Sequence, residues 1–177
     1  MKEKKLTLTL FSIATLLIVW HLSPLIFGGF VTGGADIRGS EGEIHLLQNW
    51  ATQSSQPMLW NPAIFGGLPR YHLSADEVYS LNTLLSYVAV GIGGNLGTLA
   101  LVYYLAGFFG MYLLMRNLGT QVFTAFLCGL AMMLSIHWAI LLEVGHFMKF
   151  RPLLLMPLVL WSFVKLVKDP KLLTVAI

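Results

Sequence analysis

Four long apolar runs alternate with polar segments along the chain, and each run is long enough to form a membrane-crossing helix. They cover Leu6 to about Phe27, about Leu96 to Met115, about Val122 to Leu142, and about Pro152 to Val167. A transmembrane helix needs roughly 20 mostly apolar residues. Because backbone groups in hydrocarbon must be satisfied internally, the runs predict helices. The expected fold class is therefore all-α, a polytopic transmembrane helical bundle.

The segment from 28 to 94 contains many glycine, proline and polar residues, unlike the apolar runs on either side of it. It contains two helix-start patterns, Ser40-Glu41-Gly42-Glu43 and Ser74-Ala75-Asp76-Glu77. Both fit a capping box, in which a serine side chain and a glutamate three residues later satisfy backbone N–H groups reciprocally. We expect helices of about 44–51 and 75–90 that lie at the membrane interface with an apolar face toward lipid.

These patterns divide the chain into three regions. An amino-terminal transmembrane anchor covers 1–27, a large extracytoplasmic first loop covers 28–94, and transmembrane helices two to four occupy 95–177. The first run continues past Pro24, which favours a retained anchor over a cleaved signal peptide. The apolar residues after Lys171 resemble the start of a fifth helix. We therefore expect the chain to be the amino-terminal part of a larger polytopic protein.

Composition agrees with lipid as the solvent for several helix faces. Of the 177 residues, 56% are hydrophobic and only 11% are charged, whereas soluble domains carry roughly 25% charge. No basic stripe interleaved with aromatic residues is present, so we expect no nucleic-acid partner. Cys128 is the single cysteine, which excludes an intrachain disulfide and a multi-cysteine metal site.

Basic residues set the expected orientation, because cytoplasmic loops carry an excess of lysine and arginine. With the amino terminus inside, the cytoplasmic segments hold Lys2, Lys4, Lys5, Arg116, Lys165, Lys168 and Lys171. The other side holds Arg38, Arg70, Lys149 and Arg151, together with most of the acidic residues. We expect a multi-pass protein of the inner (cytoplasmic) membrane, with its amino terminus in the cytoplasm and its polar chemistry on the outer face.

Asp36 is the candidate base. It follows the first span in a glycine-containing stretch, and no predicted helix start accounts for it. A carboxylate held near the membrane surface and partly desolvated could take a proton from a hydroxyl or hold a divalent cation. A plain surface turn is the alternative, and no cofactor is certain.

A second candidate cluster follows the third run, at Glu143, His146, Lys149 and Arg151. Glu143 and His146 would share a helical face if the third helix extends that far, but two ligands are a weak metal signal and we predict no metal site. Lys149 and Arg151 could bind a phosphate headgroup or pyrophosphate. Their alternative role is snorkelling to the interface.

The stretch from Gln56 to Tyr71 contains three prolines, a glycine pair and three aromatic residues. This composition argues against a regular element and predicts a rigid, turn-rich loop with aromatic residues at headgroup depth. The loop either anchors the protein at the interface or walls a pocket beside the membrane. In the second case Trp60 and Arg70 are candidate substrate-binding residues.

The arrangement resembles the amino-terminal part of GT-C-type glycosyltransferases, most closely the bacterial YfhO-like membrane proteins. The resemblance rests on Gly34-Ala35-Asp36, on Trp60-Asn61-Pro62 with Phe65-Gly66-Gly67-Leu68-Pro69, and on Gly145-His146-Phe147-Met148-Lys149. It implies a GT-C-like fold, a first-loop acid that serves catalysis at the position of Asp36, and a polyprenyl-phosphate-linked sugar donor.

The leading expectation is a membrane glycosyltransferase that acts on an extracytoplasmic acceptor, with Asp36 as base and His146 orienting the donor phosphate. Lys149 and Arg151 would stabilise the charge that develops on that phosphate. One alternative is a non-catalytic polytopic protein that binds or translocates a lipid-linked substrate. Another is a structural subunit whose first loop docks a partner.

Overall fold

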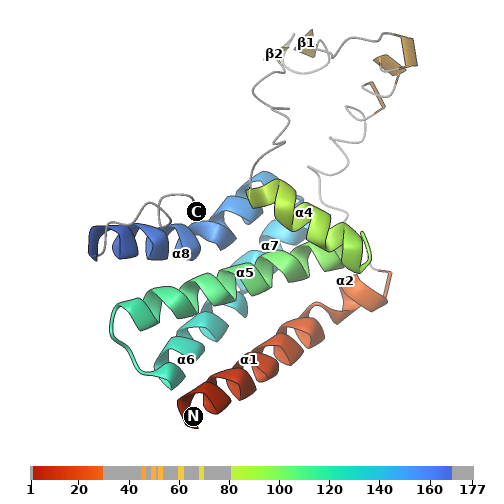
Figure 1. The fold of residues 1–177 in the computed structure, drawn as a ribbon. Helices are drawn as coiled ribbons and strands as arrows, with labels where there is room; N and C mark the ends of the chain where they lie inside the picture. The colour runs from red at the N-terminus through yellow and green to blue at the C-terminus, as the bar shows by residue number, and fades with distance from the viewer. Residues whose placement is uncertain are drawn as a thin grey trace.

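The protein is an α-helical bundle whose long helices run between two ends (Figure 1). The computed structural model describes residues 2–29, 45–46, 49–50, 52–53, 60–61, 68–69 and 81–168. Its helices are α1 (Lys2–His21), α2 (Ser23–Phe27), α4 (Leu81–Ile92), α5 (Leu96–Asn117), α6 (Val122–Met133), α7 (Ile136–Val144) and α8 (Phe147–Lys168).

Within the described residues, four stretches of helix are long and apolar enough to cross a membrane: Glu3–His21, Leu96–Asn117, Val122–Val144 and Lys149–Lys168. They coincide with the four runs expected from the sequence, with ends that differ by a few residues. The chain is therefore a membrane protein by the length and composition of its helices. The first span ends at His21, and Leu22 separates it from the short α2, which carries Pro24 in its first turn.

Helix α5 occupies the centre of the bundle and packs against α8, α6, α4, α2 and α1. Its buried side chains include Tyr103, Tyr104 and Phe108, which are at most 2% exposed. Phe108 packs edge-on against Phe11 of α1 and Phe126 of α6, and Tyr103 packs against Phe150 of α8. Because aromatic rings carry large contact areas, they form much of the core between these helices.

Two glycines let α5 and α8 approach each other closely. A Cβ at Gly107 would lie 2.8 Å from the Leu154 carbonyl oxygen, and one at Gly110 would lie 2.7 Å from the Leu158 backbone nitrogen. Small residues serve the same purpose in other membrane bundles. In lipid no hydrophobic force drives helices together, so close packing between them has to supply the attraction. These two positions account for the intimate contact of helices that are far apart in sequence.

The third span is broken, which the sequence did not predict. Helix α6 ends at Met133, and α7 begins at Ile136, after Leu134 and the N-cap residue Ser135. The indole Nε1 of Trp138 donates a hydrogen bond to the Met132 carbonyl oxygen, which also accepts a 3.3 Å bond from the Ser135 N–H. The buried Trp138 side chain thus gives the backbone at the break a hydrogen bond.

The chain reverses direction at each end of the bundle. Between α5 and α6, Thr120 N–H bonds to the Met115 oxygen and Gly119 N–H to the Arg116 oxygen, with Gly119 at φ +91°. Between α7 and α8, Gly145 also has φ +91°. Both turns have the hydrogen-bond pattern of a Schellman cap, which favours glycine at the left-handed position.

Part of the predicted first loop is described. His45, Leu46, Asn49, Trp50, Thr52 and Gln53 are helical, and Trp60–Asn61 (β1) pairs antiparallel with Leu68–Pro69 (β2). This short pairing corrects the expectation that the turn-rich stretch contains no regular element. Both predicted capping boxes lie outside the described residues.

Helix α4 corresponds to the second helix predicted in that loop. Leu81 and Leu85 pack against the core, and Ala89 is buried. The opposite side exposes large apolar groups, with Tyr87 72% and Val90 67% exposed. The helix is therefore apolar on both sides, which is expected of an element placed between protein and lipid.

Candidate functional site

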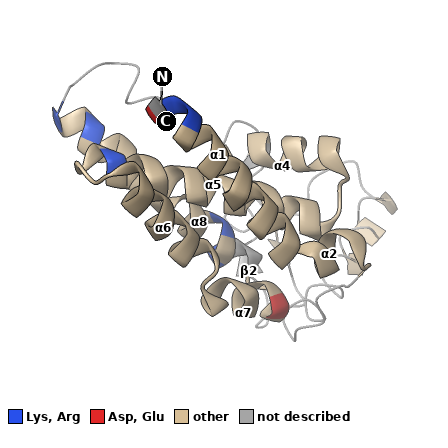
Figure 2. Ribbon diagram, turned by 90° about the horizontal axis from the view of Figure 1, so that it is seen from below, with Lys and Arg blue, Asp and Glu red and all other residues tan. Residues whose placement is uncertain are grey.

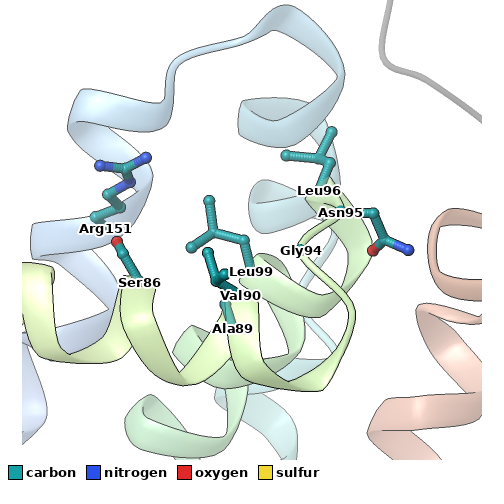
Figure 3. Close-up of a pocket in the computed structure, with 8 residues that line it drawn as sticks. All are labelled: Ser86, Ala89, Val90, Gly94, Asn95, Leu96, Leu99 and Arg151. Carbon is teal, nitrogen blue, oxygen red and sulfur yellow. The ribbon is translucent and has the colours of Figure 1, made fainter.

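A pocket of about 380 Å³ lies between α4, α5 and α8, at the end of the bundle where α2 ends (Figure 3). Most of its wall is aliphatic, and the polar side chains that line it come from three different elements. The lining residues are Ser86, Ala89, Val90, Gly94, Asn95, Leu96, Leu99 and Arg151. A largely apolar cavity with few polar groups is the usual form of a small-molecule site.

Arg151 is the charged residue in this lining. It lies in the second turn of α8, and its side chain extends along the pocket on the same side as the Ser86 hydroxyl (Figure 3). Its Nε atom is buried and has no hydrogen-bond partner among the described residues. Because a guanidinium keeps its charge in proteins and needs hydrogen-bond acceptors, this position favours an anionic ligand.

Asn95 determines how the pocket wall is joined to the rest of the bundle. Its Oδ1 accepts a 2.8 Å hydrogen bond from Thr98 N–H, and the Thr98 hydroxyl accepts one of 3.1 Å from Asn95 N–H. This reciprocal cap starts α5. The Asn95 amide points away from the pocket (Figure 3) and donates a 3.3 Å hydrogen bond to the Ile26 carbonyl of α2. Asn95 is therefore a structural residue of the site.

Gly97 brings α2 against the start of α5. A Cβ there would lie 2.5 Å from backbone atoms of Leu25 and Ile26. The predicted first loop begins at Gly28, directly after α2 ends at Phe27. The start of the first loop and the Arg151 pocket are thus at the same end of the molecule, as the sequence-based topology expects.

The cluster predicted after the third run is divided by the turn at Gly145. Glu143 is exposed on α7, whereas the His146 carbonyl accepts the first backbone hydrogen bonds of α8, from Lys149 and Phe150. The prediction that Glu143 and His146 share a helical face is wrong, because the left-handed glycine ends α7 between them. His146 itself is half-buried.

Lys149 and Arg151 also separate. Residues two apart in a helix are rotated by about 200°, so the two side chains leave α8 on different sides. Lys149 is exposed and is not part of the pocket lining, whereas Arg151 is half-buried and lines it. Lys149 and Arg151 were predicted to bind one phosphate together, but of the two it is Arg151 that lines this pocket.

The remaining predicted site residues lie in the first loop. Trp60 is in β1 and is 54% exposed. Asp36 and Arg70 lie outside the described residues, so their roles stay predictions. Among the residues that the structure describes, no group of three or more histidine, cysteine, aspartate or glutamate side chains could hold a metal ion.

Sequence reasoning missed Ser86 and Asn95. Asn95 had a recognisable signal, because an asparagine three residues before threonine at the start of an apolar run is typical of a helix N-terminus. Ser86 had none, since its place in the pocket depends on how α4 packs beside α8. Comparisons with protein-family models, with curated proteins and with solved structures gave no match.

Proposed function

We propose that the protein is a membrane glycosyltransferase, or the amino-terminal portion of one, that transfers a sugar from a polyprenyl-phosphate-linked donor to an acceptor outside the cytoplasm. The observation that carries this proposal is Arg151, the charged residue that lines a largely apolar pocket, whose Nε atom has no hydrogen-bond partner among the described residues. The resemblance to YfhO-like and other GT-C-type proteins supplies the reaction class. In this proposal the pocket end faces outward, because the opposite end is rich in lysine and arginine.

The pocket suits a ligand that is anionic at one end and apolar at the other. A phosphate oxygen would accept hydrogen bonds from the Arg151 guanidinium, and bonds of this kind are about twice as strong as those between neutral groups. Val90, Leu96 and Leu99 offer aliphatic surface to the first carbons of a lipid chain. The donor's tail would remain in the bilayer while its phosphate enters beside α8.

In the proposed reaction, Asp36 removes the proton of the acceptor hydroxyl as the acceptor oxygen bonds to the anomeric carbon of the sugar. The bond between that carbon and the phosphate oxygen breaks, and its electron pair stays on the released polyprenyl phosphate. Arg151 stabilises the charge that develops there. Lys149 contributes a positive potential from the protein surface.

The phosphate site can be tested with farnesyl phosphate, a short polyprenyl phosphate. We expect the chain in nanodiscs to bind it more tightly than farnesol, measured by calorimetry. Arg151→Gln should weaken farnesyl phosphate binding by tenfold or more, because losing a hydrogen bond to a charged group costs about 1.5–3 kcal/mol. Lys149→Gln is the matched control, with the same change of charge, and should weaken binding less. Equal binding of both compounds, or no effect of Arg151→Gln, would exclude the site.

The transfer step is tested separately by Asp36→Asn in the protein as expressed in membranes. If Asp36 is the base, lipid-linked or glycan products should fall by 10²-fold or more, while farnesyl phosphate binding is retained. The alternative function, non-catalytic binding or translocation of a lipid-linked substrate, uses the same Arg151 pocket. It predicts that Asp36→Asn has little effect, whereas charge reversal at Lys149 and Arg151 reduces binding of the lipid-linked substrate.

A further inference from the structure

The end of the bundle opposite the pocket collects basic side chains from three helices. Residues there are Lys4 and Lys5 of α1, Arg116 of α5, and Lys165 and Lys168 of α8; we call this set the basic end. Blue segments mark the starting end of α1 and the far end of α8 in Figure 2. Among the charged side chains that the structure describes, Glu3 is the acidic residue near them.

Polar contacts show that these residues lie at one end of the folded molecule. Arg116 forms a 2.8 Å ion pair with Glu3, which joins α5 to the start of α1. The Lys168 ammonium donates a hydrogen bond to the Asn117 carbonyl oxygen, which joins the end of α8 to the end of α5. Three segments distant in sequence therefore bring their cations to the same end of the bundle.

Among the residues that the structure describes, the cations of the basic end outnumber the acidic groups near them. Glu3 balances Arg116, whereas Lys4, Lys5, Lys165 and Lys168 are exposed. The Lys165 ammonium lies 5.0 Å from the centre of the Trp161 ring. Tryptophan favours the headgroup region of a bilayer, so this pair indicates that Lys165 sits at phosphate depth. Cations at that depth attract anionic headgroups.

We infer that the basic end is a binding surface for anionic phospholipid headgroups in the leaflet that surrounds it. The charge and depth of these side chains support this binding surface, whatever the function of the Arg151 pocket. The partner is a lipid with a net negative headgroup, such as phosphatidylglycerol, and not a zwitterionic lipid, whose own ammonium offsets its phosphate.

The test measures lipid selectivity in vesicles of phosphatidylcholine and phosphatidylglycerol that have the same composition in both leaflets. Electron paramagnetic resonance of spin-labelled lipids gives the relative association of each lipid with the protein. We expect phosphatidylglycerol to be preferred at low salt and the preference to shrink at high salt, because screening shortens the range of charge interactions from about 30 Å at 0.01 M to about 3 Å at 1 M.

The Lys165→Gln/Lys168→Gln variant should lower the preference for phosphatidylglycerol by about fivefold for each charge removed. The matched Lys165→Arg/Lys168→Arg variant should keep it. If loss of the Lys168 contact prevents folding, Lys4→Gln/Lys5→Gln makes the same charge change on exposed residues of α1. An unmodified chain that binds both lipids equally would overturn the inference. So would an unchanged preference in the glutamine variants, or its loss in Arg151→Gln, which would assign the preference to the pocket.

Discussion

The two ends of the bundle are held together in different ways. At the pocket end, backbone lies directly against backbone where Gly97 meets Leu25 and Ile26, and Asn95 links the start of α5 to α2. At the basic end, contacts between exposed side chains join the helices, as in the Glu3–Arg116 pair. Close packing tolerates little change, whereas exposed charged pairs contribute little energy each. The difference indicates that the pocket end is the more rigid of the two.

The largest effect is expected at Gly97. Replacing it with valine would force α2 away from α5, because backbone atoms cannot move aside as a flexible side chain can. We expect a loss of about 3 kcal/mol of stability, at the upper end of the usual range for overpacking, measured by reversible unfolding in mixed micelles. Gly91→Ala is the matched control, since a Cβ at Gly91 meets nothing within 4 Å. Equal stability of both variants would contradict the close packing of this end.

A smaller effect is expected at Asn95. Asn95→Ala removes the cap of α5 and the hydrogen bond to Ile26 together. Loss of an N-cap costs about 1 kcal/mol, and the tie to α2 adds to this. The same unfolding measurement should show the loss, and Asn95→Asp should recover most of the cap but not the donated hydrogen bond. If Asn95→Asp is as unstable as Asn95→Ala, the cap is not the main contribution.

At the basic end, Gly119→Ala should cost about 1 kcal/mol, because an alanine at φ +91° pays the penalty of a left-handed conformation. A Cβ there meets nothing within 4 Å, so the cost is conformational and not steric. Gly119→Asn should be tolerated better, since asparagine adopts this conformation more readily. Alanine and asparagine variants of identical stability would argue against a strained turn.

The smallest effect is expected for Glu3→Gln. The side chains of Arg116 and Glu3 are 35% and 66% exposed, and exposed ion pairs contribute roughly 0.2–1 kcal/mol. The variant should lose no more than this, and the loss should disappear at high salt. A loss as large as that of Gly97→Val would mean that the two ends are held equally firmly.

The spans could be predicted from the sequence because contact with lipid requires an unbroken apolar run, a pattern visible along the chain. The break at Leu134 and Ser135 could not be predicted, since no glycine or proline stands at it, both halves are apolar, and the glycine of the run, Gly129, lies within α6. The hydrogen bond from the Trp138 indole to the Met132 carbonyl depends on the folded geometry of the break.

The pocket was only partly predictable for the same reason. Arg151 stood out as a cation beside apolar residues, which is a local property of the sequence. Arg151 lines a cavity and Lys149 does not. This difference depends on how α8 is rotated about its axis relative to α4 and α5. The separation of Glu143 from His146 depends on the conformation of one glycine, which periodicity does not report.

The interrupted third span also bears on how the chain enters a bilayer. Helix α6 has 12 residues and α7 has 9, about 18 and 14 Å of helix, while the hydrocarbon layer is about 30 Å thick. Neither piece can partition into lipid as an independent unit during biosynthesis. The two must leave the translocon as a single segment. A charge introduced at Ser135 would therefore make the free energy of membrane insertion less favourable for both halves.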